Sequence, residues 1–283
     1  ISVGQSVNVL LSCILLNKCI EMGGFSVKYL NDISYKDCVG KVFKSLNSGD
    51  FKIVKYNHSK NVEIKFLKTG YEATVRLGDI RSGSIKDPYS PSVYNVGILG
   101  SKYQPTIDGV NTKEYELWKS LLQRCYSDDF KKKRPTYIGC EVSENFKSYE
   151  YFYEWCHKQI GFSNQGWQLD KDLLIKGNKV YSESTCVFIP SEINSLLIKC
   201  TASRGEHLIG VYWSKTANAF ASMVSKNKGK QEWLGCFNTE IEAFNAYKTA
   251  KESFIKEQAD KWKDKIDTRA YNALMNYTVN IDD

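Results

Sequence analysis

Three short runs of alternating apolar and polar residues lie close together near the end of the chain. They cover residues 208–213, 218–225 and 231–237, and the polar segments KTAN and KNKGK separate them. Such alternation predicts half-buried strands joined into an antiparallel meander. Asn238-Thr239 follows as the cap of a helix that reaches about residue 262, with apolar positions at helical spacing: Ile241, Phe244, Tyr247 and Ala250. We therefore predict a three-stranded sheet with one face covered by a helix and the other face open.

A second set of alternating runs occupies residues 51–56, 62–67 and 72–77, with Asn-, Ser- and Gly-containing turns between them. This spacing predicts a small five-stranded barrel or a curled meander over residues 36–88. Residues 1–35 stay unassigned, and the proline-containing stretch 89–111 is expected to be a linker.

The middle of the chain, residues 112–202, alternates between helical and strand-like patterns. Thr112 is expected to open a helix with one apolar stripe: Tyr115, Trp118, Leu122 and Cys125. A basic loop, FKKKR, follows at 130–134, and an aromatic helix is predicted at 149–159. Residues 167–199 then read as strand, loop, strand and helix. A short helix at 268–275 lies in the tail, 263–283. The fold class is therefore α+β with several domains.

The amino-acid composition indicates which class of partner the protein binds. The chain has 283 residues, 42% hydrophobic and 25% charged, which is typical of soluble globular proteins. Its net charge of +7 and 13% aromatic content favour nucleic acid over a membrane surface or a small-molecule substrate. The nine cysteines form no Cys-x-x-Cys pair, which disfavours a zinc ribbon and indicates reduced thiols in a cytoplasm. No apolar run approaches the roughly 20 residues that span a bilayer.

Several motifs of the C-terminal meander resemble one family of DNA-binding domains. GVYWSK, AFASMV, WLGCF and TEIEAFNAYKTA are similar to the ethylene-response-factor (Apetala-type) domain, which also occurs in phage and bacterial mobile endonucleases. The resemblance covers residues 203–262 and implies that the open sheet face enters the major groove of double-stranded DNA. Phe220 is expected to pack inside the domain instead. The candidate DNA-binding residues are Tyr212, Trp213, Ser214, Lys215, Met223, Ser225, Lys226, Gln231 and Trp233.

The segment 167–199 resembles the ββα-metal core of His-Asn-His (HNH) endonucleases, notably phage homing enzymes. The resemblance implies a divalent cation, Mg²⁺ or Mn²⁺, with Asp170 and Asn194 as its ligands and Asn178 as the loop asparagine. Lys171 stands where the family has its general-base histidine, so the core is degenerate. A hard, oxygen-rich site suits such a cation and stabilises charge on a scissile phosphate.

The lysine at the base position leaves three alternatives. Lys171 loses its proton through burial and acts as the base, Asp172 serves in its place, or the fold only grips DNA. The basic residues Lys131, Lys132, Lys133 and Arg134 either contact the phosphate backbone or form a solvated charge run. We expect a DNA-binding protein of phage or mobile-element type, acting as a metal-dependent endonuclease. The alternatives are a non-catalytic DNA-binding or regulatory protein, and an interaction protein whose basic charge is incidental.

Overall fold

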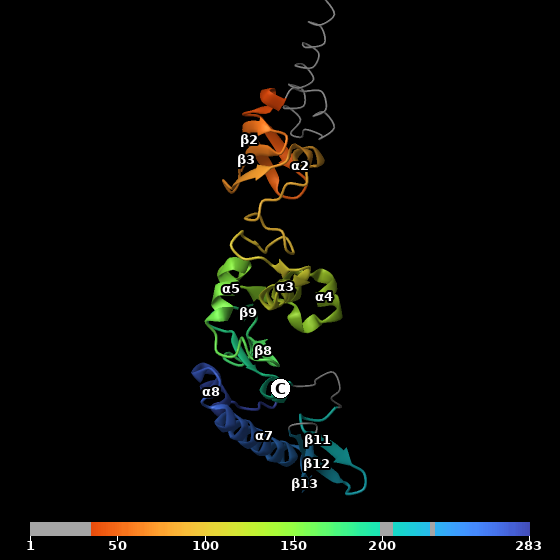
Figure 1. The fold of residues 1–283 in the computed structure, drawn as a ribbon. Helices are drawn as coiled ribbons and strands as arrows, with labels where there is room; N and C mark the ends of the chain where they lie inside the picture. Colours follow the sequence, from red (N-terminus) through yellow and green to blue (C-terminus); the bar gives the residue numbers. More distant parts are fainter. Residues whose placement is uncertain (1–34, 199–205, 227–229) are drawn as a thin grey trace, which may run out of the picture. The chain divides into compact units, whose positions relative to one another are not determined.

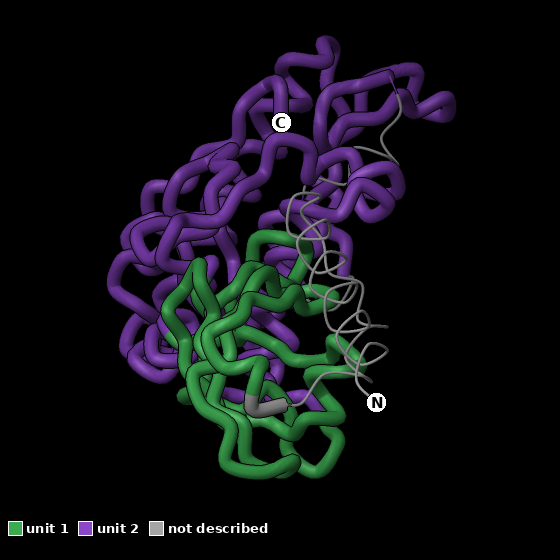
Figure 2. Tube along the Cα trace, turned by 90° about the horizontal axis from the view of Figure 1, so that it is seen from above, with its two compact units in different colours: residues 1–110, 148–150 green, residues 111–147, 151–283 purple. Residues whose placement is uncertain are grey.

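The computed structural model describes residues 35–198, 206–226 and 230–283. The expectations for the N-terminal segment, for part of the KNKGK turn and for the helix end near residue 199 lie outside these ranges. The chain divides into two compact units, which Figure 2 distinguishes by colour. The first comprises residues 1–110 and 148–150, and the second comprises residues 111–147 and 151–283.

The first unit is built on a four-stranded antiparallel meander. Its strands are β1 (Val42–Ser45), β2 (Gly49–His58), β3 (Asn61–Phe66) and β4 (Glu72–Val75), hydrogen-bonded in that order, after the 3₁₀ turn η2 (Tyr35–Cys38) (Figure 1). Phe51 and Ile53 of β2 point into the core, while Lys52 between them is exposed, as the alternation predicts.

The predicted five-stranded barrel is wrong, and the curled meander is the arrangement observed. The chain leaves β4 into the short helix α2 (Leu77–Ser82), and the described part of this unit adds no fifth strand to the sheet. Leu77 and Ile80 of α2 are buried in the same apolar cluster as Phe51 and Ile64. The helix therefore covers the apolar sheet face that a closed barrel would otherwise bury. Two short strands, β5 (Thr106–Ile107) and β6 (Val110–Asn111), occur where the chain passes between units.

The second unit begins with helix α3 (Lys113–Tyr126). Thr112 caps it, because its hydroxyl accepts a hydrogen bond from the backbone N–H of Tyr115 at 3.3 Å. Trp118, Leu122 and Cys125 are buried, which confirms most of the predicted stripe. The basic segment expected as a loop belongs instead to helix α4 (Asp128–Lys133), which the side chain of Ser127 caps.

Short elements lead from α4 to a strand–loop–strand–helix segment. They are η3 (Pro135–Tyr137), β7 (Glu141–Val142), η4 (Asn145–Lys147) and α5 (Tyr149–His157). Strand β8 (Trp167–Asp170) pairs antiparallel with β10 (Val187–Pro190), and α6 (Ser191–Leu196) follows directly. The loop between the strands contains β9 (Val180–Tyr181), which pairs in parallel with β7. The predicted order of elements in this segment is confirmed.

The C-terminal meander and helix are also present as predicted. Strands β11 (Val211–Ser214), β12 (Ala219–Ser225) and β13 (Gln231–Phe237) form an antiparallel sheet in that order, followed by α7 (Glu240–Trp262) and α8 (Thr268–Met275). Thr239 and Glu242 form a reciprocal capping box at the start of α7. Phe244 and Tyr247 are buried, but Ile241 is half exposed, so the apolar stripe begins one turn later than predicted.

Helix α7 joins the two parts of the second unit. Its first half packs on the sheet, where Phe244 and Tyr247 meet Val224. Its second half, with Ile255 and Ala259, packs in one core with residues of β10, α6 and α8 (Figure 1). Within the described ranges, no helix combines the length and the apolar content needed to cross a membrane.

Candidate functional site

A cavity of about 430 Å³ lies in the second unit where α3, η3, β8 and α6 approach one another. Four of the predicted site residues line it together: Asp170, Lys171, Asp172 and Asn194. Asn178 is not among the lining residues and lies in the loop between β8 and β9. The strand–loop–strand–helix segment therefore gathers carboxylate, ammonium and amide groups around one hollow.

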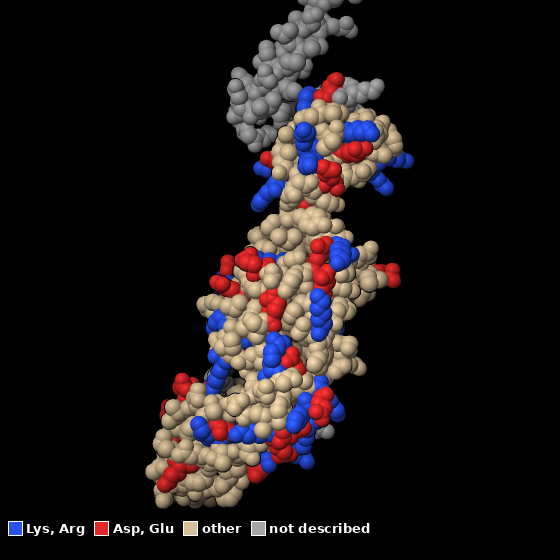
Figure 3. Space-filling view, turned by 90° about the vertical axis from the view of Figure 1, so that its left-hand side faces the viewer, with Lys and Arg blue, Asp and Glu red and all other residues tan. Residues whose placement is uncertain are grey.

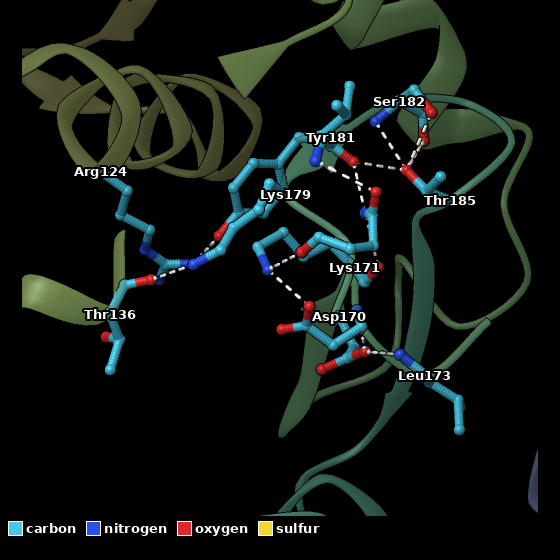
Figure 4. A network of polar contacts seen from close by, with 12 residues as sticks. Arg124, Thr136, Asp170, Lys171, Leu173, Lys179, Tyr181, Ser182 and Thr185 are labelled. Carbon is cyan, nitrogen blue, oxygen red and sulfur yellow. Dashed lines mark hydrogen bonds and ion pairs between the residues drawn. The ribbon is translucent and has the colours of Figure 1, made fainter. Parts of the chain in front are cut away.

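Asp170 is the last residue of β8 and caps the turn that follows. Its Oδ1 accepts hydrogen bonds from the backbone N–H groups of Asp172 at 2.8 Å and Leu173 at 2.7 Å (Figure 4). Burial raises the pKa of the Asp170 carboxyl, and these two N–H groups only partly offset that effect. A negative charge is therefore costly at this position, and a cation bound beside it would favour the ionised form.

Lys171 is nearly buried, with a side chain 9% exposed, and its ammonium has three partners. It donates to Asp172 Oδ1 at 2.6 Å and to the Asn178 carbonyl oxygen at 2.7 Å, and it lies 5.6 Å from the centre of the Tyr181 ring (Figure 4). A carboxylate, a carbonyl and a ring face are partners for the protonated amine. In these contacts the Lys171 side chain donates hydrogen bonds as an ammonium. To act as a base, it would have to lose the proton that one of these hydrogen bonds uses.

Asn178 closes the loop around that lysine. Its Nδ2 donates to the backbone carbonyls of Lys171 at 2.9 Å and Val180 at 2.6 Å, and its Oδ1 accepts from the Val180 N–H at 3.1 Å. Asn178 therefore holds the chain before β9 against the end of β8. These are the contacts of a residue that positions the loop.

Asn194 approaches the cavity from α6. Its Nδ2 donates to Gln168 Oε1 at 2.6 Å, which leaves its own Oδ1 as an acceptor. The Asp170 carboxylate and the Asn194 amide supply the hard oxygen ligands that Mg²⁺ or Mn²⁺ prefers, and Mg²⁺ completes its shell with water or phosphate oxygens. Among the described residues, no three His, Cys, Asp or Glu side chains cluster as a metal site.

Arg124 of α3 was missed by the sequence reasoning, and it also lines the cavity. Its Nη1 donates to the Tyr181 hydroxyl at 3.4 Å (Figure 4). Its guanidinium carbon lies 5.7 Å from the centre of the Tyr137 ring. A signal for it existed in the sequence. Leu117, Leu121 and Arg124 follow one another at helical spacing, so α3 has a second face beside its predicted apolar stripe.

The C-terminal sheet has one face turned away from α7. The register pairs Met223 with Trp233 and Ser225 with Gln231, and cross-strand partners share a face. Alternation along β12 and the pairing with β11 add Tyr212 and Ser214 to the same face, while Val224 faces α7. Trp233 is 60% exposed. Six of the predicted DNA-binding residues therefore share this open face: Tyr212, Ser214, Met223, Ser225, Gln231 and Trp233.

Two of the predicted DNA-binding residues, Trp213 and Lys226, lie on the other side of the sheet. Trp213 packs edge-on against Phe220 with ring centres 5.0 Å apart, and Phe220 packs against other rings as expected. Lys226 forms an ion pair with Glu232, and its ammonium lies 5.5 Å from the Phe254 ring of α7. Phe220 and Lys226 alternate with Val224 and so lie on the α7 side, and Trp213 joins them because it pairs with Phe220 across the strands. Lys215 is exposed in the turn after β11.

The basic residues 131–134 occupy the end of α4 and the residue after it. Lys132, Lys133 and Arg134 are exposed, and Lys132 forms a surface ion pair with Asp129 at 3.3 Å. On the face of the molecule in Figure 3, Lys and Arg side chains lie among Asp and Glu side chains. Positive and negative side chains of the described residues are therefore mixed on that face, without a continuous basic track.

Comparison of the chain with family models, with curated proteins and with solved structures finds no match in any of the three.

Proposed function

We propose that this protein binds double-stranded DNA and cleaves its phosphodiester bonds with the help of Mg²⁺ or Mn²⁺, as an HNH-like endonuclease of the phage or mobile-element type. The observation that supports this most directly is the cavity that gathers Asp170, Asp172 and Asn194 at the end of β8. Oxygen ligands for a divalent cation beside cationic side chains form the combination that phosphate-ester hydrolysis requires.

Each residue then has a role that its contacts allow. Asp170 and Asn194 would hold the cation, which when bound stabilises negative charge on the scissile phosphate. Asp172 is the candidate base, because its carboxylate is 53% exposed and water reaches it. Lys171 fixes the orientation of that carboxylate through the 2.6 Å hydrogen bond, and Asn178 fixes the loop that carries both.

DNA binding is assigned to the open face of the C-terminal sheet and to the basic end of α4. The face presents Tyr212, Met223 and Trp233 together with Ser and Gln side chains, which suit base edges in a major groove. Lys133 and Arg134 are exposed and suit phosphate oxygens. The ERF-type (Apetala-type) interpretation of residues 203–262 belongs to this proposal.

A second candidate function is DNA binding without cleavage, and one observation favours it. Lys171 stands at the base position, and its ammonium is engaged by Asp172 and Asn178. An imidazole would accept a proton there at neutral pH, whereas a lysine ammonium has no lone pair with which to accept one. The protein would then be a regulator or a degenerate homing enzyme.

Plasmid nicking separates the two candidates. Supercoiled plasmid is incubated with the purified protein in Mg²⁺ or Mn²⁺, and the variants Asp170→Ala, Asp172→Asn and Asn194→Ala are compared with Asp264→Ala, which removes an exposed carboxylate outside the cavity. Metal-dependent nicking that the three cavity variants lose and the control keeps supports the endonuclease. Equal nicking by all variants contradicts it.

Duplex binding is measured on the same preparations over a salt series. A protein that neutralises phosphates loses affinity steeply as salt rises. Salt-dependent binding with no metal-dependent nicking supports the second candidate. Absence of duplex binding even in dilute buffer contradicts both.

A further inference from the structure

We infer that Arg124 and Tyr181 form an anion-binding pair in the cavity, which receives one phosphate group. This inference rests on the proposed function in taking that phosphate to belong to the DNA backbone. It adds a binding role for two residues that the sequence motifs do not mark. It also places phosphate recognition on α3 and β9, separate from the oxygen ligands on β8 and α6.

Arg124 is the cation of the cavity with unused charge. The other lining cation, Lys171, contacts the Asp172 carboxylate at 2.6 Å. Among the described residues no carboxylate forms a salt bridge with Arg124, and its one hydrogen-bond partner is the neutral Tyr181 hydroxyl at 3.4 Å. A guanidinium has five N–H donors, so most of its hydrogen-bonding capacity is available to an anion.

Tyr181 supplies a second donor next to it. Its hydroxyl oxygen accepts from Arg124, and in the described part of the chain its proton has no acceptor. The residue is buried, and this burial raises the pKa of the Tyr181 phenol, so the hydroxyl keeps its proton at neutral pH. An oxygen that binds near Arg124 can therefore accept from an N–H and from an O–H at once.

Neighbouring groups hold both side chains in place before any anion arrives. The Tyr137 ring lies 5.7 Å from the Arg124 guanidinium carbon, and the Lys171 ammonium lies 5.6 Å from the centre of the Tyr181 ring. Figure 4 shows Arg124 and Lys171 on either side of Tyr181. Donors that are already oriented lose little freedom when they bind a ligand, which favours affinity.

The ligand follows from the chemistry of these groups. A forked guanidinium beside a hydroxyl matches the tetrahedral oxygens of a phosphate. Contacts of this kind position a nucleic acid without reading its sequence. A phosphate of the DNA backbone and a phosphate of a free nucleotide present the same oxygens, so the experiment has one arm for each source.

The test uses the full chain and isothermal titration calorimetry in metal-free, low-salt buffer. The probes are thymidine bisphosphate, thymidine without phosphate, and a short DNA duplex. The variants are Arg124→Gln and Tyr181→Phe. The matched control is Lys119→Gln, which removes an exposed cation of the same helix that does not line the cavity. Arg124→Lys retains the charge without the fork, and thermal unfolding shows that each variant is folded.

We expect Arg124→Gln to weaken thymidine bisphosphate binding about tenfold or more and Tyr181→Phe to weaken it about fivefold, since a charge-assisted hydrogen bond contributes more than a neutral one. Arg124→Lys should fall between wild type and Arg124→Gln, Lys119→Gln should match wild type, and thymidine should not bind. Bisphosphate affinity that is unchanged in both cavity variants overturns the inference, as does equal binding of thymidine.

The duplex arm separates this inference from the proposed function. If the duplex binds but replacing Arg124 or Tyr181 changes the affinity for neither the bisphosphate nor the duplex, the anion site is wrong while DNA binding stands. If the bisphosphate depends on the pair but the duplex does not bind, the site exists for a free nucleotide and the proposed function is wrong.

Discussion

The Lys171 ammonium and the Asp172 carboxylate lie 2.6 Å apart, yet the lysine side chain is 9% exposed and the aspartate side chain is 53% exposed. The pair therefore extends from the interior to the surface of the cavity wall. The second hydrogen bond of Lys171, to the Asn178 carbonyl, ties the same ammonium to the loop. Lys171 thus stabilises the site as a buried cation, whatever chemistry the site performs.

Replacing this lysine by an apolar residue of similar length should destabilise the protein. In Lys171→Met the Asn178 carbonyl loses its donor, which we expect to lower the free energy of unfolding by about 1–3 kcal/mol. The loss stays below that of a fully buried ion pair, because water can solvate the half-exposed Asp172. Urea unfolding measures the loss, and Asp172→Asn, which keeps an acceptor oxygen, should cost less. A Lys171→Met protein as stable as wild type would show that these contacts contribute nothing.

Asp170 should make stability depend on pH in an identifiable direction. Burial raises the pKa of this carboxyl above its ordinary value of 3.8, so the folded state binds the proton more tightly than the unfolded state. The Asp170 carboxyl contributes most to stability at acidic pH, where it is protonated. This contribution is lost as pH rises from 3.8 through the raised pKa of the folded state. In Asp170→Asn this loss disappears, so the variant should gain stability relative to wild type across that window.

Urea unfolding of wild type and Asp170→Asn at a series of pH values checks this prediction. Asp264→Asn, which changes an exposed carboxyl, controls for the general effect of removing one charge. The difference between wild type and Asp170→Asn should grow with pH in the window and then become constant. A difference that does not vary with pH would contradict the assignment of a raised pKa to Asp170.

Local signals predicted much of the fold. Helix α8 spans the predicted residues 268–275, and the capping residues Thr112 and Thr239 stand where the sequence places them. The strand order at 167–199 also follows from short apolar runs and the Pro190-Ser191 start of α6. These features depend on neighbours within a few residues, which a sequence displays directly.

Features that depend on distant contacts could not be predicted in the same way. The approach of Arg124 to Tyr181 depends on two segments 57 positions apart, and β9 exists only because β7 pairs with it. The first sheet stays open because the following segment forms helix α2 instead of a fifth strand. Helix α4 is different, since Ser127 followed by Asp128 and Asp129 is a cap signal that the basic run concealed.

A side chain at Gly210 should destabilise the protein more than one at a comparable open glycine. Its φ is +77°, and a Cβ placed on it would lie 2.0 Å from the Tyr247 ring of α7. Gly139 has nearly the same φ, +76°, with nothing within 4 Å of the Cβ position. Gly139→Ala should therefore cost only the backbone strain, about 1–2 kcal/mol. Gly210→Ala should cost a further 1–3 kcal/mol or so, because Tyr247 is packed in the core.

Urea unfolding of the two alanine variants side by side measures this difference. Because the two φ angles match, the excess loss in Gly210→Ala reports the contact between the sheet and α7. Equal losses would mean that Tyr247 moves aside without cost, and that the close approach of β11 to α7 does not stabilise the unit.

Replacing Arg134 should change the salt dependence of DNA binding more than the preference of the protein for particular DNA sequences. The residue is exposed after α4, where it can neutralise a phosphate. In Arg134→Gln we expect the slope of log affinity against log salt to fall by about one. Fluorescence anisotropy with a labelled duplex over a salt series measures the slope. An unchanged slope would place this basic segment outside the DNA interface.

Trp233 offers the sharpest test of the open face, because its contribution to folding and its contribution to binding should separate. The side chain is 60% exposed and pairs with Met223 across the strands, so Trp233→Ala should change the free energy of unfolding by no more than about 0.5 kcal/mol. Duplex affinity should fall about tenfold if the indole is a central contact, and the salt slope should stay constant because no phosphate contact is lost.

Phe220→Ala is the matched variant on the opposite face. Phe220 packs between Trp213 and His207, so its removal should lower stability by about 1–3 kcal/mol, less than for a fully buried phenylalanine. Its effect on duplex affinity, measured where the variant is folded, should be small. If Trp233→Ala leaves duplex affinity intact while Phe220→Ala reduces it, the DNA does not lie on the open face. The duplex would then contact the face that carries Phe220.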